Sequence, residues 1–284
     1  MTGISTTWRA RSTARRAANS SAMDRAARAG FAARGVLYLL IGFIALRVAF
    51  HEDDGKQADR SGALAEIADK PFGSVVLWAL GIATAGMALW RLSEAAFGAS
   101  GPDGHKARKR LFSACRAVFY GFVAYSVLAF AAHQGGGGGG GGGNSSDRQS
   151  RDFTAKALEM PAGRWLVGAV GIGVIVAGAW ILIRAVRRKF RKHLKTAQMG
   201  PRVRRTVDVL GICGGVARGV LFGTIGVFAL IAAIRFDPDK AKGIDDTLRS
   251  FAQTSAGPWL LVVIAVGLVA FSGFSFASAR YRKT

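Results

Sequence analysis

Residues 31–50 read FAARGVLYLLIGFIALRVAF and carry no charge except Arg34 and Arg47. A bilayer core about 30 Å thick needs about 20 residues of helix at about 1.5 Å per residue, so this stretch predicts a membrane-spanning helix. Five further stretches have the same character, at about 73–96, 112–132, 163–186, 209–234 and 258–279. Hydrocarbon offers no water to backbone groups, so each must be helical. The predicted fold class is an all-α polytopic membrane protein with six spans.

Charge is concentrated between these stretches. The 284 residues include 39 Lys and Arg against 17 Asp and Glu, a net charge of +22, although half of the residues are hydrophobic. Basic residues outnumber acids 22 to 3 in four connections, 1–30, 98–111, 187–208 and 280–284. The other three carry 10 basic residues against 13 acids, and they are 51–72, 133–162 and 235–257. Because cytoplasmic loops retain Lys and Arg, this alternation predicts a cytoplasmic-membrane protein with both termini in the cytoplasm.

The same segregation excludes several classes of protein. A soluble globular enzyme or a disordered basic tail would not keep its charges between six apolar stretches. Cys115 and Cys213 alone make no disulfide framework. Topology already accounts for the positive charge, so nucleic acid is not expected as a partner.

Three internal repeats are visible in the chain. RGVLY at 34–38 recurs as RAVFY at 116–120 and RGVLF at 218–222. The second stretch of each unit carries Gly73, Gly163 or Gly257, followed 17 residues later by an aromatic residue, and a short interfacial helix is expected before each glycine. The sequence therefore predicts three tandem two-helix hairpins in parallel orientation, which allows a pseudo-threefold axis along the membrane normal. The predicted units are a basic arm at 1–27 and repeats at 28–97, 110–186 and 209–281, with a flexible Gly-rich outer loop at 135–143.

The stretch RAGFAARGVLY at 28–38, its recurrence and the Pro-x-Gly entry to the second helix resemble the bacterial membrane family called domain of unknown function 1206. The resemblance implies the same three units over about 25–281 and a bacterial membrane, and it implies no activity. The second copy departs from the pattern at Ala117 and in its glycine run. The third copy has Pro258 after its entry glycine rather than before it.

Each repeat places an arginine one turn inside the predicted cytoplasmic boundary: Arg34, Arg116 and Arg218. One interpretation is a ring of three cations that contacts lipid phosphate or another anion. The favoured interpretation is that each long side chain extends to the headgroups. Glu94, the acid within a predicted span, follows Arg91 by three residues, which predicts an ion pair rather than a transport carboxylate.

Small residues recur at helical spacing and predict close helix packing, because lipid provides no hydrophobic drive between helices. Contact within one subunit is favoured over contact between copies. The predicted packing residues are Gly35, Ala117, Gly121, Gly211, Gly215, Gly219 and Gly223.

The sequence contains no pattern of catalytic residues. The four histidines are scattered over connections, and the outer acids Asp237, Asp239, Asp245 and Asp246 lack the spacing of a calcium loop. No catalytic residue, metal or cofactor is therefore expected.

The predicted function is a non-enzymatic structural or interaction protein whose basic cytoplasmic surfaces hold anionic lipid or an acidic partner. The alternative is a small channel or transporter along the pseudo-threefold axis. The expected partners are the bilayer and its anionic lipids, with a second copy of the chain or another membrane protein as the alternative.

Overall fold

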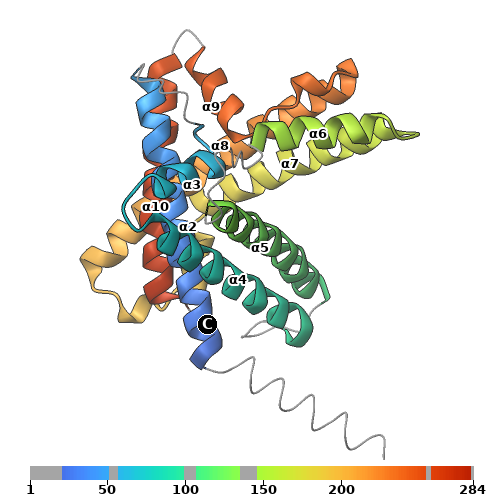
Figure 1. Ribbon diagram of the computed structural model, residues 1–284. Coiled ribbons are helices and arrows are strands. Elements are labelled where there is room, and N and C mark those ends of the chain that lie inside the picture. The colour runs from blue at the N-terminus through green and yellow to red at the C-terminus, as the bar shows by residue number, and fades with distance from the viewer. Residues whose placement is uncertain (1–20, 51–56, 99–106, 135–145, 254–256, 283–284) are drawn as a thin grey trace, which may run out of the picture.

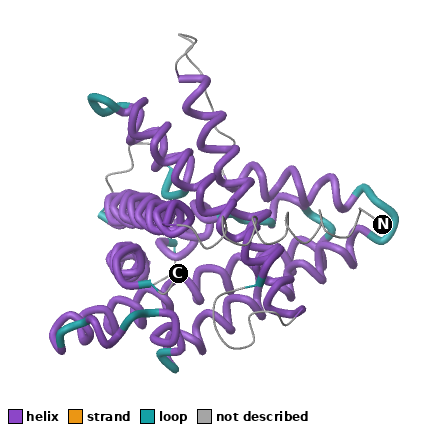
Figure 2. Tube along the Cα trace, turned by 90° about the horizontal axis from the view of Figure 1, so that it is seen from below, coloured by secondary structure: helices purple, strands orange, loops and turns teal. Residues whose placement is uncertain are grey.

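The computed structural model describes residues 21–50, 57–98, 107–134, 146–253 and 257–282 (Figure 1). Residues 1–20 of the predicted arm and the predicted linker 135–143 lie outside this part of the chain. Helices joined by short loops make up the described residues, which contain no strand (Figure 2). The long helices are α2 (Ser21–Ala49), α4 (Gly73–Phe97), α5 (Ala107–Gln134), α7 (Gly163–Val186), α8 (Pro201–Arg235) and α10 (Gly257–Tyr281).

All six are long and apolar enough to cross a membrane, so the six predicted spans are confirmed. Three of them begin clearly earlier than predicted, among them α5, which starts at Ala107 rather than at about 112. Helix α8 starts at Pro201, whose fixed φ suits a first helical turn and whose missing N–H is not needed there. Helix α2 extends back to Ser21 through the polar residues Asp24, Arg25 and Arg28. Apolarity marks the part of a helix in the bilayer and does not mark where the helix begins.

A short helix precedes the second span of each repeat, as predicted. These are α3 (Arg60–Ala68), α6 (Ser146–Leu158) and α9 (Ile244–Ala252). Three 3-10 turns complete the described structure: η1 (Lys189–His193), η2 (Thr196–Gln198) and η3 (Pro238–Lys240).

The Pro-x-Gly motif forms the same tight turn in repeats 1 and 2. Phe72 and Ala162 adopt left-handed backbone conformations, with φ of 63° and 64°. A Cβ atom on Gly73 or Gly163 would collide with the carbonyl oxygen of Ile67 or Ala157, at the end of the preceding short helix. The glycine is therefore required for the close approach of two helices rather than for its φ.

The main helix pairs join one repeat to the next. Helix α4 packs along α5, α7 along α8, and α10 along α2, which closes the cycle from repeat 3 to repeat 1. Figure 1 shows these pairs as three arms that diverge from a common junction. Within repeats 1 and 3 the two spans also contact each other, whereas in the described residues α5 and α7 do not pack along their lengths. Repeat 2 is therefore open where the other two are closed.

Apolar side chains fill the junction between repeats. Five of the six spans contribute to one core, and α3 and α9 add side chains from the end opposite Arg34. Its members include Leu37, Ile41, Leu77, Leu80, Val123, Val127, Leu221, Ile264 and Leu268. This packing gives no support, among the described residues, to a polar path along the axis.

Candidate functional site: an arginine and aromatic ladder

Two of the three predicted arginines stack on the same aromatic ring. The guanidinium carbons of Arg34 on α2 and Arg218 on α8 lie 5.0 and 4.2 Å from the ring centroid of Phe271 on α10. Arg34 donates hydrogen bonds from Nε to Ser275 Oγ at 3.2 Å and from Nη1 to Tyr120 Oη at 3.4 Å. Both partners are side chains of neighbouring helices, Ser275 on α10 and Tyr120 on α5, and Arg34 is half-buried between them.

The stacking continues beyond Arg34. Its guanidinium carbon lies 4.9 Å from the ring centroid of Phe31, and Arg282 lies 4.6 Å from the same centroid. Arg282 is 5.2 Å from the ring centroid of Trp90, above which Arg91 lies at 4.2 Å. We call this series the arginine ladder, and its members in order are Arg218, Phe271, Arg34, Phe31, Arg282, Trp90 and Arg91.

The ladder has little negative charge to balance it. Arg91 Nη1 forms an ion pair with Glu94 Oε2 at 2.6 Å, which confirms the predicted i, i+3 pair. Ser113 Oγ also donates to Glu94 Oε2, at 3.4 Å. Cation–π contact offsets part of the repulsion among the arginines, at about 0.5–2 kcal/mol per contact.

Three hydrogen-bond donors in the ladder are buried without an acceptor among the described residues. They are the Nε atoms of Arg91, Arg218 and Arg282. Burying a polar group without a partner costs free energy, and a charged group costs more. Unsatisfied donors within a cluster of like charges are the arrangement that an anion would complete.

Arg282 is held in the ladder by the connection between repeats 2 and 3. Lys195 donates its backbone N–H to Tyr281 O at 2.7 Å, and Leu194 forms an isolated antiparallel bridge with Arg282. The pKa of Arg282 is lowered to about 9, by burial first and then by the charges of Arg91 and Arg34. The backbone therefore places a third cation beside two others.

The third predicted arginine, Arg116, lies beside the ladder and not within a symmetric ring. Its side chain is exposed, and His193 lies in the field of Arg282, Arg184, Arg116 and Arg91 together. Burial and these four charges lower the pKa of His193 to about 4. In place of the symmetric ring considered as one interpretation, the structure has an asymmetric cluster. It includes Arg91, which the sequence analysis named only as the partner of Glu94, and Arg184 and Arg282, which it did not single out.

The predicted small residues mark contacts at most positions. A Cβ atom on Gly35 would lie 2.9 Å from the ring of Phe276, and one on Gly211 would lie 2.7 Å from the ring of Phe190. Gly219 lies against Leu182, Gly215 lies against Ala185, and Ala117 is buried.

Two predicted positions differ from the rest. A Cβ on Gly121 would meet nothing within 4 Å, so Gly121 does not mark a close helix contact. A Cβ on Gly223 would also meet nothing within 4 Å. The backbone N of Gly223, however, would lie 2.6 Å from a Cβ on Gly178. Gly178 and Gly171 on α7, which the sequence analysis did not single out, complete the α7–α8 contact.

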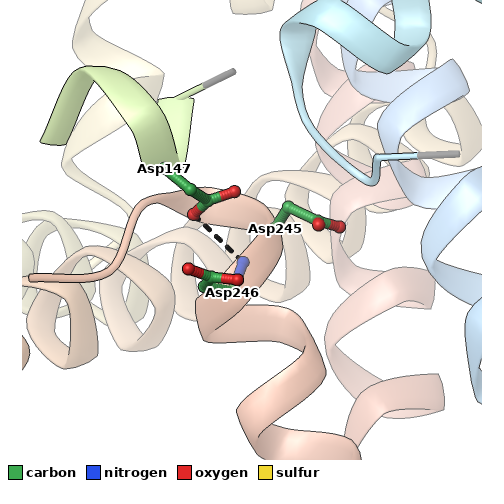
Figure 3. Close-up of side chains that lie close together, drawn as sticks. All are labelled: Asp147, Asp245 and Asp246. Carbon is green, nitrogen blue, oxygen red and sulfur yellow. Dashed lines mark hydrogen bonds between the residues drawn. The ribbon is translucent and has the colours of Figure 1, made fainter. Parts of the chain in front are cut away.

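The opposite end of the molecule carries an acidic cluster of Asp147, Asp245 and Asp246 (Figure 3). One carboxylate oxygen from each lies within 4.8 Å of the others. The cluster borders a cavity of about 420 Å³, lined also by Gln57, Arg148, Arg151, Asp152 and Asp239. Of the four outer acids noted in the sequence, only Asp245 and Asp246 belong to the cluster, and Asp147 comes from repeat 2.

Contacts within the protein account for this cluster. Asp245 accepts hydrogen bonds from Ala58 N at 2.7 Å and Arg249 Nε at 2.9 Å. Asp147 Oδ1 accepts from Asp246 N at 3.1 Å, and Arg151 pairs with Asp246. Residues of all three repeats meet here, so the cluster is the structural junction at this end.

The acidic cluster predicts that the stability of the protein depends on pH. Burial, followed by the charges of Asp246, Asp245 and Asp59, raises the pKa of Asp147 to about 6, although the hydrogen bond from Asp246 opposes the shift. The folded protein then binds this proton more tightly than the unfolded chain, so stability falls as the pH rises from about 4 to about 6. Asp147→Asn keeps an acceptor for Asp246 and is expected to stabilise the protein at pH 7.5 by up to about 3 kcal/mol.

Thermal unfolding of the detergent-extracted protein between pH 4 and 8 measures this effect. Asp152→Asn is the control, because Asp152 lines the same cavity but is exposed. Equal shifts in the two variants would contradict the assignment to Asp147.

The fold and the site define a multi-pass membrane protein built from three repeats of one helical unit. The model of the family described as a domain of unknown function (DUF1206) matches three times, at residues 29–98, 113–188 and 213–282. The chain belongs to this family, as the resemblance implied. It is 30% identical over 263 residues to the uncharacterized protein YxxB of Bacillus subtilis strain 168, covering 92% of this chain and 91% of that protein. No solved structure matches it.

Proposed function

We propose that this is a non-enzymatic interaction protein of the bacterial cytoplasmic membrane that holds an anionic group, foremost a lipid phosphate, at the arginine ladder. The observation that carries the proposal is the three buried Nε donors without an acceptor, on Arg91, Arg218 and Arg282. A phosphate oxygen can accept from several guanidinium groups at once, and arginine suits phosphate through its planar set of donors.

The alternation of basic and acidic connections supports an orientation with the ladder on the cytoplasmic side. That side faces the leaflet in which anionic headgroups attract basic protein segments. The scattered histidines and the absence of a catalytic pattern in the sequence support a role that is not enzymatic.

Native mass spectrometry of the protein extracted in mild detergent tests the proposal. Wild-type protein is expected to retain a bound anionic lipid. In Arg34→Gln/Arg218→Gln, which removes both cations on Phe271, the bound fraction should fall at least about tenfold, because charge-assisted hydrogen bonds contribute about 1.5–3 kcal/mol each.

The control is Arg164→Gln/Arg235→Gln, which removes two exposed positive charges at the opposite end of the spans. It should retain the lipid as wild type does. Equal retention in all three proteins, or a bound acidic protein in place of a lipid, would contradict the proposal. Thermal unfolding checks that the ladder variant is folded, and we expect it to be, because loss of repulsion offsets loss of the Arg34 hydrogen bonds.

A further inference from the structure

The open arrangement of repeat 2 has a cause in the sequence. In repeat 1, a Cβ on Gly30 would lie 2.5 Å from Met87 Cβ, where α2 crosses α4. In repeat 3, a Cβ on Gly214 would lie 2.5 Å from Phe271 Cα, where α8 crosses α10. Both glycines stand four residues before the repeated arginine, and the residue at that position in repeat 2 is Phe112. A phenylalanine has no room at such a crossing, so α5 does not close on α7.

The consequence is that repeat 2 exposes its spans most. The buried share of one apolar 18-residue window in each span is 28% in α5 and 17% in α7, and it is 33–50% in the other four spans. The exposed apolar side chains include Val118, Phe122 and Tyr125 on α5 and Leu166, Val170, Val176 and Trp180 on α7. In a bilayer these faces lie at the depth of the acyl chains.

At the basic end of these two faces lie two members of the arginine cluster. Arg116 on α5 is exposed and Arg184 on α7 is half-buried, and each lies within the field of the other. Arg91, which is buried in the ladder, also lies within the field of Arg116. An anion that arrives along the faces of α5 and α7 would therefore meet Arg116 and Arg184 first and the unpaired donor of Arg91 next.

We infer that the ligand of the arginine ladder is an anionic diacyl phospholipid. Its chains lie along the exposed faces of α5 and α7, and its phosphate binds between Arg116 and Arg184, against the unpaired Nε donor of Arg91 in the ladder. This inference rests on the proposed function and adds the place and the source of the anion. The positive charge at one end of these faces suits the phosphate of such a lipid, and the apolar surface beyond it suits the acyl chains.

Photocrosslinking locates the lipid. The protein is placed in nanodiscs of phosphatidylcholine containing phosphatidylglycerol with a diazirine in one acyl chain, and crosslinked peptides are mapped. Peptides of α5 and α7 are expected to carry several-fold more label than those of the other spans. In Arg116→Gln/Arg184→Gln this excess should fall at least about fivefold, while Arg164→Gln/Arg235→Gln keeps it.

Two further experiments distinguish a lipid headgroup from a free phosphate compound as the source of the anion. Phosphatidylcholine with the same diazirine should give no excess on α5 and α7, and added glycerol 3-phosphate should not displace phosphatidylglycerol. Label spread evenly over the six spans, an excess unchanged in Arg116→Gln/Arg184→Gln, or displacement by glycerol 3-phosphate would overturn the inference. Native mass spectrometry could then still show a bound anion that is lost in Arg34→Gln/Arg218→Gln. In that case the proposed function would stand, and only the position inferred for the lipid would be wrong.

Discussion

Gly178→Leu is expected to separate α7 from α8 and to destabilise the protein by about 3 kcal/mol or more. A Cβ on Gly178 would lie 2.6 Å from the backbone N of Gly223 and 2.8 Å from the carbonyl oxygen of Gly219. Both obstacles are backbone atoms, which cannot rotate away as a side chain can. Overpacking a well-packed contact costs about 1–3 kcal/mol, and more when the backbone must move.

Gly173→Leu is the matched control. Gly173 lies on the same helix, is exposed, and has nothing within 4 Å of the position of a Cβ. Because leucine favours a helix more than glycine does, this variant should be as stable as wild type or slightly more stable. The measurement is the midpoint of thermal unfolding in detergent. Similar losses in both variants would show that α7 and α8 are not held together by backbone proximity.

Anion binding at the ladder is expected to raise the pKa of His193 by about one pH unit, roughly tenfold in proton affinity. Without an anion, burial and the charges of Arg282, Arg184, Arg116 and Arg91 lower this pKa to about 4, although the side chain reaches the surface. A bound phosphate cancels part of that positive field, so the pKa should move toward about 6.5, the ordinary value for histidine.

The lowered pKa of His193 links protonation of this side chain to the stability of the protein. A lowered pKa means that the folded protein without an anion resists protonation, so it loses stability as the pH falls from about 6.5 to about 4. Protonated His193 attracts an anion, so anion affinity should rise over the same interval. The ¹H NMR signal of the imidazole reports the pKa in a variant that keeps only His193, with His51, His105 and His133 replaced by Gln.

The titration is made in neutral detergent and again with phosphatidylglycerol added. Arg282→Gln provides a control, since removing one of the four charges should raise the pKa without any lipid. An unchanged pKa when lipid is bound would place the lipid away from the ladder.

The spans and repeats could be predicted from sequence because each depends on residues close together in the chain. Length and apolarity identify a span regardless of its neighbours. The entry glycines Gly73 and Gly163 were also visible, since the obstacle each avoids lies only six residues earlier, at Ile67 and Ala157.

The ladder could not be predicted in the same way, because its members come from α2, α4, α8, α10 and the residue after α10. Nothing in the sequence says that Phe31 lies between Arg34 and Arg282, 248 residues apart. The open arrangement of repeat 2 is reflected in the sequence. At the position four residues before the repeated arginine, repeats 1 and 3 have Gly30 and Gly214, whereas repeat 2 has Phe112. Interpreting that difference requires knowing that the two glycines lie at helix crossings.

The cyclic pairing of α4 with α5, α7 with α8 and α10 with α2 bears on how such a chain arises. Each repeat has its longest contacts with its neighbours rather than within itself. A protein of one such repeat would bury those surfaces only by assembling as a homotrimer, and gene duplication would join three subunits into one polypeptide. Three copies in one chain need not be identical, and Phe112 stands where the other two copies have glycine, a difference that a symmetric trimer could not confine to a single site.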